Sequence, residues 1–259
     1  MKTCISSYSY HRLLSSGQMS YFDIIEKTKE LGFDAIEFSI GDDLPGGRET
    51  VAKLRAKCAE VGLPIASYTT GANFFVADQA AEIARVKEHV DRAEILGAPL
   101  MRHDICYGFY EGYTGVRTFD AMVPYVAPAI REVTEYAATK GIRTMSENHG
   151  YVAQDADRLA KVFTAVGSTN YGWLCDVGNF CCADEDSAVS VGKLAPMCFH
   201  CHVKDMFLRS GMLPDPGRGW GRTRAGNYFR GTIFGQGNIP ALQCLQNLKR
   251  NGYDGYISL

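Results

Sequence analysis

Histidine and lysine alternate in one short stretch of this chain, residues 199–205, which read FHCHVKD. Successive side chains of a strand point to opposite faces, so His200, His202 and Lys204 would share one face. Two imidazoles and an ammonium group on one face of a buried strand suit a metal or substrate site better than an apolar core. We therefore predict that this stretch contributes to a functional site.

Two further stretches each place a carboxylate at the end of a short apolar run, just before a glycine turn. They read MSENHG over residues 145–150 and WLCDVGN over residues 173–179. Glutamate, aspartate and histidine together provide the oxygen and nitrogen ligands of a catalytic divalent cation. The sequence therefore predicts that Glu147, Asp176 and His202 bind one metal ion.

A joint that recurs along the chain indicates which elements position these side chains. It consists of an amphipathic helical segment, a glycine and a short apolar run. A glycine just past a helix adopts the left-handed conformation that caps the helix end. Each joint therefore predicts a helix that leads into a strand. The joints lie at residues 30–37, 60–65, 95–101, 139–145, 165–167 and 250–254.

Strands that alternate with helices at this spacing form parallel βαβ units, and eight strands in about 250 residues are typical of a (β/α)8 TIM barrel. A doubly wound parallel sheet is the alternative α/β fold. We predict a single domain over residues 1–259, in which no helix follows the last strand. The predicted strands lie near residues 2–7, 34–39, 64–68, 99–104, 143–148, 171–176, 198–204 and 254–259. The predicted helices lie near residues 20–31, 47–61, 78–96, 118–140, 155–166, 184–194 and 239–250.

Catalytic groups of such a barrel lie at the C-terminal ends of its strands. Glu147, Asp176 and His202 lie at the ends of predicted strands five, six and seven. Neighbouring strands are about 4.8 Å apart, so three adjacent strand ends can converge on one ion. The predicted fold and the predicted ligands therefore agree.

Other polar residues near predicted strand ends are candidates for substrate binding or proton transfer. His103, at the end of strand four, could bind substrate or relay a proton. Glu37, at the end of strand two, could bind a substrate hydroxyl or form a surface salt bridge. Lys204 could stabilise an enolate oxygen or pair with a nearby acid. His200, one layer deeper, suits a satisfied core histidine as well as catalysis, and His149 could support the site or cap a helix.

A long segment, residues 206–238, is rich in glycine and proline and carries five arginines against a single acid, Asp215. Loops of this length in a compact domain are usually functional lids or disordered segments. An arginine-rich lid over a metal site favours an anionic or polyhydroxylated substrate, and Arg230 is our candidate for a substrate contact. An oligomer contact or a solvated loop is the alternative. The arginines are Arg209, Arg218, Arg222, Arg224 and Arg230.

The composition is that of an ordinary globular protein, with 46% hydrophobic and 22% charged residues and a net charge of −2. A protein that neutralises many phosphates is usually basic, so we do not expect nucleic acid as a partner. The N-terminus lacks the apolar run of a signal peptide, and no stretch reaches the length of a membrane span. Nine scattered cysteines fit reduced thiols better than a disulfide framework. We therefore expect a cytoplasmic protein with no membrane partner.

Four motifs, in order from strand five to the last strand, resemble those of the sugar phosphate isomerase/epimerase family, the xylose isomerase-like TIM barrels. The resemblance implies one divalent cation, commonly Mn, Mg, Co or Zn, held by Glu, Asp, His and a final Glu on strand eight. The first three match Glu147, Asp176 and His202. The fourth would directly follow Leu259, so we expect the chain to be cut short there. The motifs are Glu147-Asn148-His149-Gly150, Asp176-Val177-Gly178-Asn179-Phe180, His200-Cys201-His202-Val203-Lys204-Asp205 and Gly252-Tyr253-Asp254-Gly255-Tyr256-Ile257-Ser258-Leu259.

The chain departs from the family pattern at two places. Asn179, a candidate for substrate binding, stands where many ketose epimerases have a second histidine. In addition, no glutamate follows Glu147 within the next turn, as one does in those enzymes. Both departures argue against ketose 3-epimerase activity in particular.

The resemblance implies isomerisation or epimerisation of a sugar, sugar phosphate or related polyol ketone through a metal-stabilised enediolate. Glu147 would be both ligand and base, and Lys204 or His103 would polarise the oxygen. One alternative is a dehydratase of the inosose or dehydroshikimate type, and another is a non-catalytic barrel that lacks its fourth ligand. An endonuclease IV-like DNA repair nuclease is less favoured, because that site needs many more ligands than six histidines allow. The expected partner is a small sugar-like molecule, and since such barrels often pair, a homo-oligomer is compatible.

Overall fold

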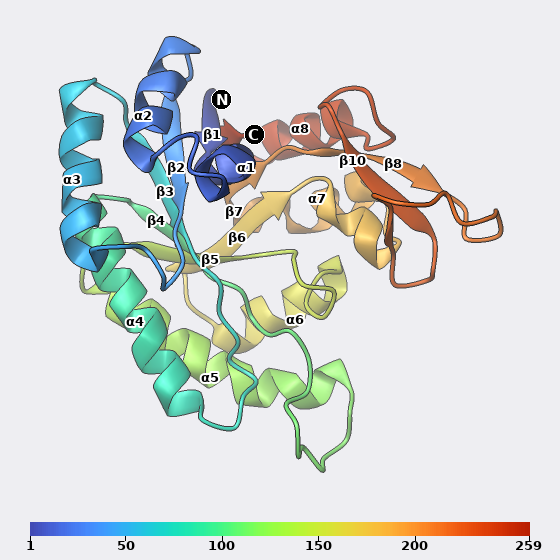
Figure 1. Ribbon diagram of the computed structural model, residues 1–259. Helices are drawn as coiled ribbons and strands as arrows, with labels where there is room; N and C mark the ends of the chain where they lie inside the picture. The colour runs from blue at the N-terminus through green and yellow to red at the C-terminus, as the bar shows by residue number, and fades with distance from the viewer.

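The computed structural model describes residues 1–259 and contains a closed barrel of eight parallel strands. Each strand pairs with the next along the chain, and the last pairs with the first, so the doubly wound alternative is wrong. Figure 1 shows the strands at the centre with the helices arranged around them. The barrel strands are β1 (Lys2–Ser6), β2 (Ala35–Ser39), β3 (Ile65–Thr69), β4 (Leu100–Arg102), β5 (Arg143–Glu147), β6 (Tyr171–Asp176), β7 (Cys198–His202) and β11 (Tyr256–Ser258).

All seven predicted helices are present, although α7 and α8 begin at Ser187 and Ala241, later than the predicted residues 184 and 239. Ser20 caps α2 in a capping box with Asp23, and Gly97 and Gly167 end α4 and α6 in the left-handed conformation. The short helix α1 was not predicted. The helices are α1 (His11–Ser15), α2 (Tyr21–Glu30), α3 (Gly47–Glu60), α4 (Gln79–Leu96), α5 (Phe119–Ala138), α6 (Ala156–Val166), α7 (Ser187–Leu194) and α8 (Ala241–Arg250). Three 3-10 helices complete the set: η1 (Ser7–Tyr10), η2 (Asn179–Ala183) and η3 (Ala195–Met197).

The main apolar core contains 57 buried residues and includes helix positions such as Ile24, Leu54 and Val90 as well as strand residues. A second cluster contains only Cys4, Ala35 and Ala66. Ala35 lies two positions before Glu37 and therefore shares its strand face. Small side chains thus fill the barrel interior next to β1, β2 and β3, whereas the larger Met145 and Leu174 are completely buried below Glu147 and Asp176.

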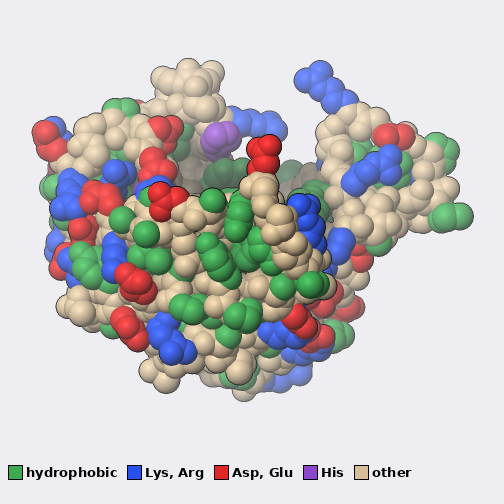
Figure 2. Space-filling view, turned by 90° about the horizontal axis from the view of Figure 1, so that it is seen from below, with side chains coloured by type: hydrophobic (Ala, Val, Ile, Leu, Met, Phe, Trp, Pro, Cys, Tyr) green, Lys and Arg blue, Asp and Glu red, His purple; other side chains and the backbone are tan.

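The segment 206–238 is not a structureless lid, which corrects the sequence-based prediction. It forms a three-stranded antiparallel sheet of β8 (Asp205–Arg209), β10 (Tyr228–Thr232) and β9 (Gly221–Arg222). The buried Asp205 carboxylate holds its base, because it accepts backbone N–H groups of Gly235, Gly237 and Ile239. Figure 1 shows this sheet projecting from the barrel, and the space-filling view in Figure 2 shows a projecting lobe on the same side next to a hollow.

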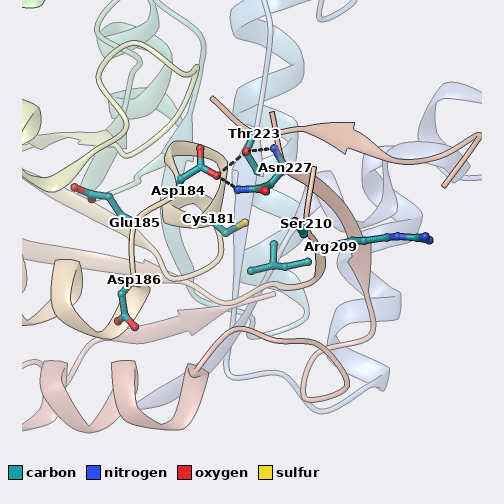
Figure 3. A pocket seen from close by; sticks show the side chains of 9 residues that line it. Cys181, Asp184, Glu185, Asp186, Arg209, Ser210, Thr223 and Asn227 are labelled. Atoms are coloured by element: carbon teal, nitrogen blue, oxygen red, sulfur yellow. Dashed lines mark hydrogen bonds between the residues drawn. The ribbon is translucent and has the colours of Figure 1, made fainter. Parts of the chain in front are cut away.

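A cavity of about 410 Å³ separates the small sheet from η2 and the start of α7. At its edge the Asp184 carboxylate accepts hydrogen bonds from the Thr223 hydroxyl and the Asn227 side-chain amide (Figure 3). Asp184 has a positive φ, and its carboxylate also accepts the Ala225 backbone N–H. These bonds connect the lobe to the barrel. No helix of the chain is both long and apolar enough to span a membrane.

Candidate metal centre

A polar cavity of about 380 Å³ opens at the C-terminal ends of the barrel strands. This is the end at which TIM barrels place their chemistry. Acidic and basic side chains are interspersed on the face shown in Figure 2, so no single-sign charge field covers it. The polar side chains that line the cavity include Glu37, Thr69, Arg102, Glu147, His149, Asp176, His202 and Lys204.

The structure brings the three predicted metal ligands together. The ligand atoms of Glu147, Asp176 and His202 lie within 4.8 Å of one another. The parallel register explains this, because Glu147 pairs with Leu174 on β6, and Asp176 pairs with His202 on β7. Leu174 lies two residues before Asp176, so Asp176 and His202 extend two residues beyond the level of Glu147, and all three side chains share one face at adjacent strand ends.

Asp176 is held by its own turn and by a cation. Its Oδ1 accepts the backbone N–H groups of Gly178, at 2.8 Å, and Asn179, at 3.1 Å. Its Oδ2 lies 3.0 Å from Nζ of Lys204. Burial and the neighbouring Glu147 charge raise the pKa of Asp176, although the Lys204 ammonium opposes this shift. The pairing with Lys204 is the local ion pair that the sequence left open.

Glu147 is oriented through both of its oxygens. Oε1 accepts a hydrogen bond of 2.8 Å from the Asn179 side-chain amide, and Oε2 lies 2.7 Å from Nη2 of Arg102. Burial alone would raise the pKa of Glu147, but the Arg102 and His202 charges bring it below its ordinary value. Glu147 is therefore held in its carboxylate form.

Glu37 is completely buried, so the alternative of a surface salt bridge is wrong. His202 Nε2 lies 2.9 and 3.0 Å from its two oxygens, and His200 Nε2 lies 2.8 Å away but outside hydrogen-bonding geometry. Burial opposes protonation of His202, yet the Glu37 and Glu147 charges raise its pKa to about 9. Glu37, His200 and His202 form a second group whose ligand atoms lie within 4.8 Å of one another. His202 therefore belongs to both groups of potential metal ligands.

These residues fit a divalent cation. Two buried carboxylates and one imidazole converge from three strand ends, which is the donor chemistry of Mn²⁺, Co²⁺ or Zn²⁺ sites and also suits Mg²⁺ through its carboxylates. Glu37 lies behind His202 and would orient the imidazole, as carboxylates do for metal-bound histidines. The ion would be bound by Glu147, Asp176 and His202.

Comparison with protein families supports the fold and places the chain in a group. Residues 25–259 match the family model described as xylose isomerase-like TIM barrel. The chain belongs to this family. No curated protein sequence matches the chain significantly.

Solved structures with the xylose isomerase-like TIM barrel fold resemble this chain closely in shape but weakly in sequence. The probable 3-DHS dehydratase of petrobactin synthesis from Bacillus anthracis has a TM-score of 0.74 and 17% identity, and the match covers 100% of this chain and 92% of that one. D-psicose 3-epimerase with D-tagatose from Clostridium cellulolyticum H10 has a TM-score of 0.72 and 19% identity, with 100% and 84% covered. A xylose isomerase-like protein from Mycobacterium smegmatis in complex with magnesium has a TM-score of 0.68 and 18% identity, with 92% and 80% covered.

His103 does not line the cavity of this xylose isomerase-like barrel, contrary to the sequence-based expectation for strand four. It is completely buried on the opposite side of the barrel wall, where its ring stacks on Tyr171 and makes a T-shaped contact with Phe74. Its Nδ1 donates to the Asp104 carbonyl at 2.9 Å. Side chains alternate along β4, so the cavity position belongs to Arg102.

Arg102 lines the cavity and was not predicted from the sequence. Its Nη2 lies 2.7 Å from both Glu147 and Asp104, and its Nη1 donates to the Thr70 carbonyl at 3.1 Å. Asp104 in turn lies 3.1 Å from Nδ1 of His149 and accepts a hydrogen bond from the Tyr107 hydroxyl. The alternation of apolar Met101 with Arg102 was the available signal.

The remaining candidates fall into three groups. His149 and Lys204 line the cavity, and Asn179 contacts it through Glu147. His200 lies behind it against Glu37. Arg230 is exposed on β10 of the small sheet and does not line the cavity, so the structure does not bring it to the site.

Proposed function

We propose that the protein is a divalent-metal-dependent isomerase or epimerase that acts on a sugar or a related polyol ketone by moving a proton next to the carbonyl. The convergence of Glu147, Asp176 and His202 on the cavity carries this proposal. The bound ion would supply positive charge that stabilises the developing oxyanion. One structural neighbour was solved in complex with magnesium, which supports a divalent cation.

The side chains around the ion site have distinct roles in this reaction. Glu147 is oriented by Asn179 and Arg102 and held as a carboxylate, so it can accept the proton on carbon. Lys204, which lies beside Asp176 at the cavity wall, would stabilise negative charge on the substrate oxygen. The D-psicose 3-epimerase among the structural neighbours supports this class of reaction.

Dehydration of a hydroxylated ketone is the second candidate, and the position of His149 favours it. Asp104 holds His149 through Nδ1, which leaves Nε2 without a protein partner at the cavity. That nitrogen could donate a proton to a departing β-hydroxyl after the carbon is deprotonated. The probable dehydratase among the structural neighbours supports this alternative.

The test replaces Glu147 with Gln, which keeps the shape of the side chain and removes its basicity. We expect exchange of the substrate α-proton with D₂O, followed by NMR on a panel of ketoses and inososes, to fall at least about a hundredfold, as for loss of a general base. Product structures then separate epimers and isomers from dehydrated ketones.

Metal content by plasma mass spectrometry is measured on the same samples, with His202→Ala as the control that removes a ligand. About one ion per chain in the wild type, lost in His202→Ala, is the expected result. Unchanged proton exchange in Glu147→Gln would contradict the proposed role of this residue. A wild-type chain that binds the ion but exchanges no proton in any substrate would favour the non-catalytic barrel.

A further inference from the structure

A second cavity, of about 420 Å³, adjoins the one that contains the metal ligands. Tyr8 and Ser39 line both cavities, so the two are neighbours separated by these side chains. The second cavity is built by η1, α1 and the loop that follows β2, and its further lining includes His11, Tyr21 and Asp43. None of these three lines the first cavity.

Aromatic rings shape the wall between the cavities. The rings of Tyr8 and His11 stack with their centroids 5.4 Å apart and an interplanar angle of 19°. Tyr8 is 68% exposed, so much of its ring is accessible from solvent. The Tyr21 hydroxyl donates to the Ser39 carbonyl at 3.1 Å, which fixes the floor where the two cavities meet. A flat ring face is therefore open to a ligand.

Unused hydrogen-bonding groups surround this ring. The hydroxyl groups of Tyr8 and Ser39, the imidazole of His11 and the carboxylate of Asp43 make no side-chain hydrogen bonds within the protein. Pockets that bind small molecules combine apolar faces with a few such polar groups. Hydroxyl groups of a ligand can donate to Asp43 and exchange hydrogen bonds with Ser39 and Tyr8.

The charge of the second cavity selects among ligands. No lysine or arginine lines it, and its one charged carboxylate is Asp43. A phosphate would meet this negative charge without a cation to offset it. A neutral sugar ring fits better, since its C–H face can lie on an aromatic ring while its hydroxyls reach the carboxylate.

We propose that the second cavity is a subsite for a second sugar ring carried by the substrate. The substrate class would then be a glycosyl-substituted polyol ketone rather than a sugar phosphate, with the ketone in the first cavity and the substituent beyond Tyr8. This inference rests on the proposed function, because it takes the first cavity as the place of the ketone.

Direct binding tests the subsite without turnover. Dissociation constants for the intact, metal-loaded protein are measured by NMR titration with D-fructose and with three glycosylated fructoses that carry the second ring on O3, O4 or O6: turanose, lactulose and isomaltulose. We expect at least one of them to bind about fivefold or more tightly than D-fructose, the gain of one or more net hydrogen bonds. Equal or weaker binding of all three would overturn the proposal.

Two variants test whether the second cavity causes the tighter binding of the disaccharide. Asp43→Asn and His11→Ala are expected to reduce the ratio of D-fructose to disaccharide dissociation constants toward one. Glu49→Gln is the matched control, because Glu49 is an exposed carboxylate on nearby α3 that does not line the cavity. A preference that persists in both subsite variants, with folding verified by circular dichroism, would overturn the proposal.

The two proposals fail in distinguishable ways. Proton exchange of the ketone in D₂O reports on the metal centre, whereas the ratio of dissociation constants reports on the subsite. Exchange with no preference for the disaccharides rejects the subsite and leaves the proposed function intact. A preference that is lost in Asp43→Asn, without exchange in any ketone, supports the subsite and rejects the isomerase.

Discussion

Arg102 and His103 are neighbours in sequence that enter two regions of opposite character. Arg102 faces the barrel interior, where it lies between the carboxylates of Asp104 and Glu147. His103 faces the apolar surroundings of Phe74 and Tyr171, and burial lowers its pKa to about 4. The interior thus retains charge by pairing it, whereas the outer layer excludes charge by keeping its histidine neutral.

The pairing in the interior extends over several carboxylates. Burial would raise the pKa of Asp104, but the Arg102 charge lowers it to about 2. Burial would also raise the pKa of Glu37, but the neighbouring His202 and His200 hold it well below the ordinary value. Buried charges are stable in proteins only when they are paired in this manner. The comparison teaches that a shift of one residue along a strand decides which chemistry is available.

The largest expected effect comes from removal of the interior cation. Arg102→Leu leaves the buried carboxylates of Glu147 and Asp104 without their partner, and we expect the free energy of unfolding to fall by about 3–5 kcal/mol. Arg102→Lys keeps the charge and should lose less. Urea denaturation at neutral pH measures both. A stable Arg102→Leu protein with ordinary metal content would show that the ion pairs do not hold the interior together.

A smaller effect on the free energy of unfolding should depend on pH and should come from His103 in the outer layer. The folded-state pKa of His103 lies below its unfolded value of about 6.5, so the unfolded chain binds a proton between these pH values and the folded chain does not. Stability from this residue is therefore present above about pH 6.5 and is lost as the pH falls toward 4, by up to about 3 kcal/mol.

His103→Gln provides the comparison, because glutamine does not titrate and can still donate to the Asp104 carbonyl that His103 Nδ1 contacts. Urea denaturation of wild type and variant between pH 4 and 7 gives the difference in slope. We expect the variant to lose less stability across this range. Equal slopes would mean that His103 does not remain neutral when the rest of the chain is folded.

Much of the fold could be predicted because its signals are local. The glycine joints mark helix ends that the structure confirms, such as Gly97 after α4 and Gly167 after α6. The gathering of Glu147, Asp176 and His202 follows from their positions at the C-terminal ends of three adjacent parallel strands, which requires only the strand order. These inferences needed no knowledge of side-chain packing.

The parts that could not be predicted depend on contacts between distant residues. The choice of Arg102 over His103 depends on which face of β4 enters the barrel, and one residue of register reverses it. The base of the small sheet of β8, β9 and β10 is held by hydrogen bonds from the backbone N–H groups of Gly235 and Gly237 to the Asp205 carboxylate. The local sequence shows the glycines of this segment, but it does not show which distant residue accepts hydrogen bonds from their N–H groups.

The smallest expected effect is at the surface. Glu49 and Lys53 form an ion pair on α3 whose side chains are 74% and 61% exposed. Water and salt screen such a pair, so Glu49→Gln should leave the free energy of unfolding unchanged within error in urea denaturation at low and at high salt. Arg102→Leu should remain destabilising in both, since its partners are shielded from solvent. If salt instead changed the effects of both variants on the free energy of unfolding equally, burial would not explain why the Arg102 ion pairs contribute more to stability than the Glu49 pair.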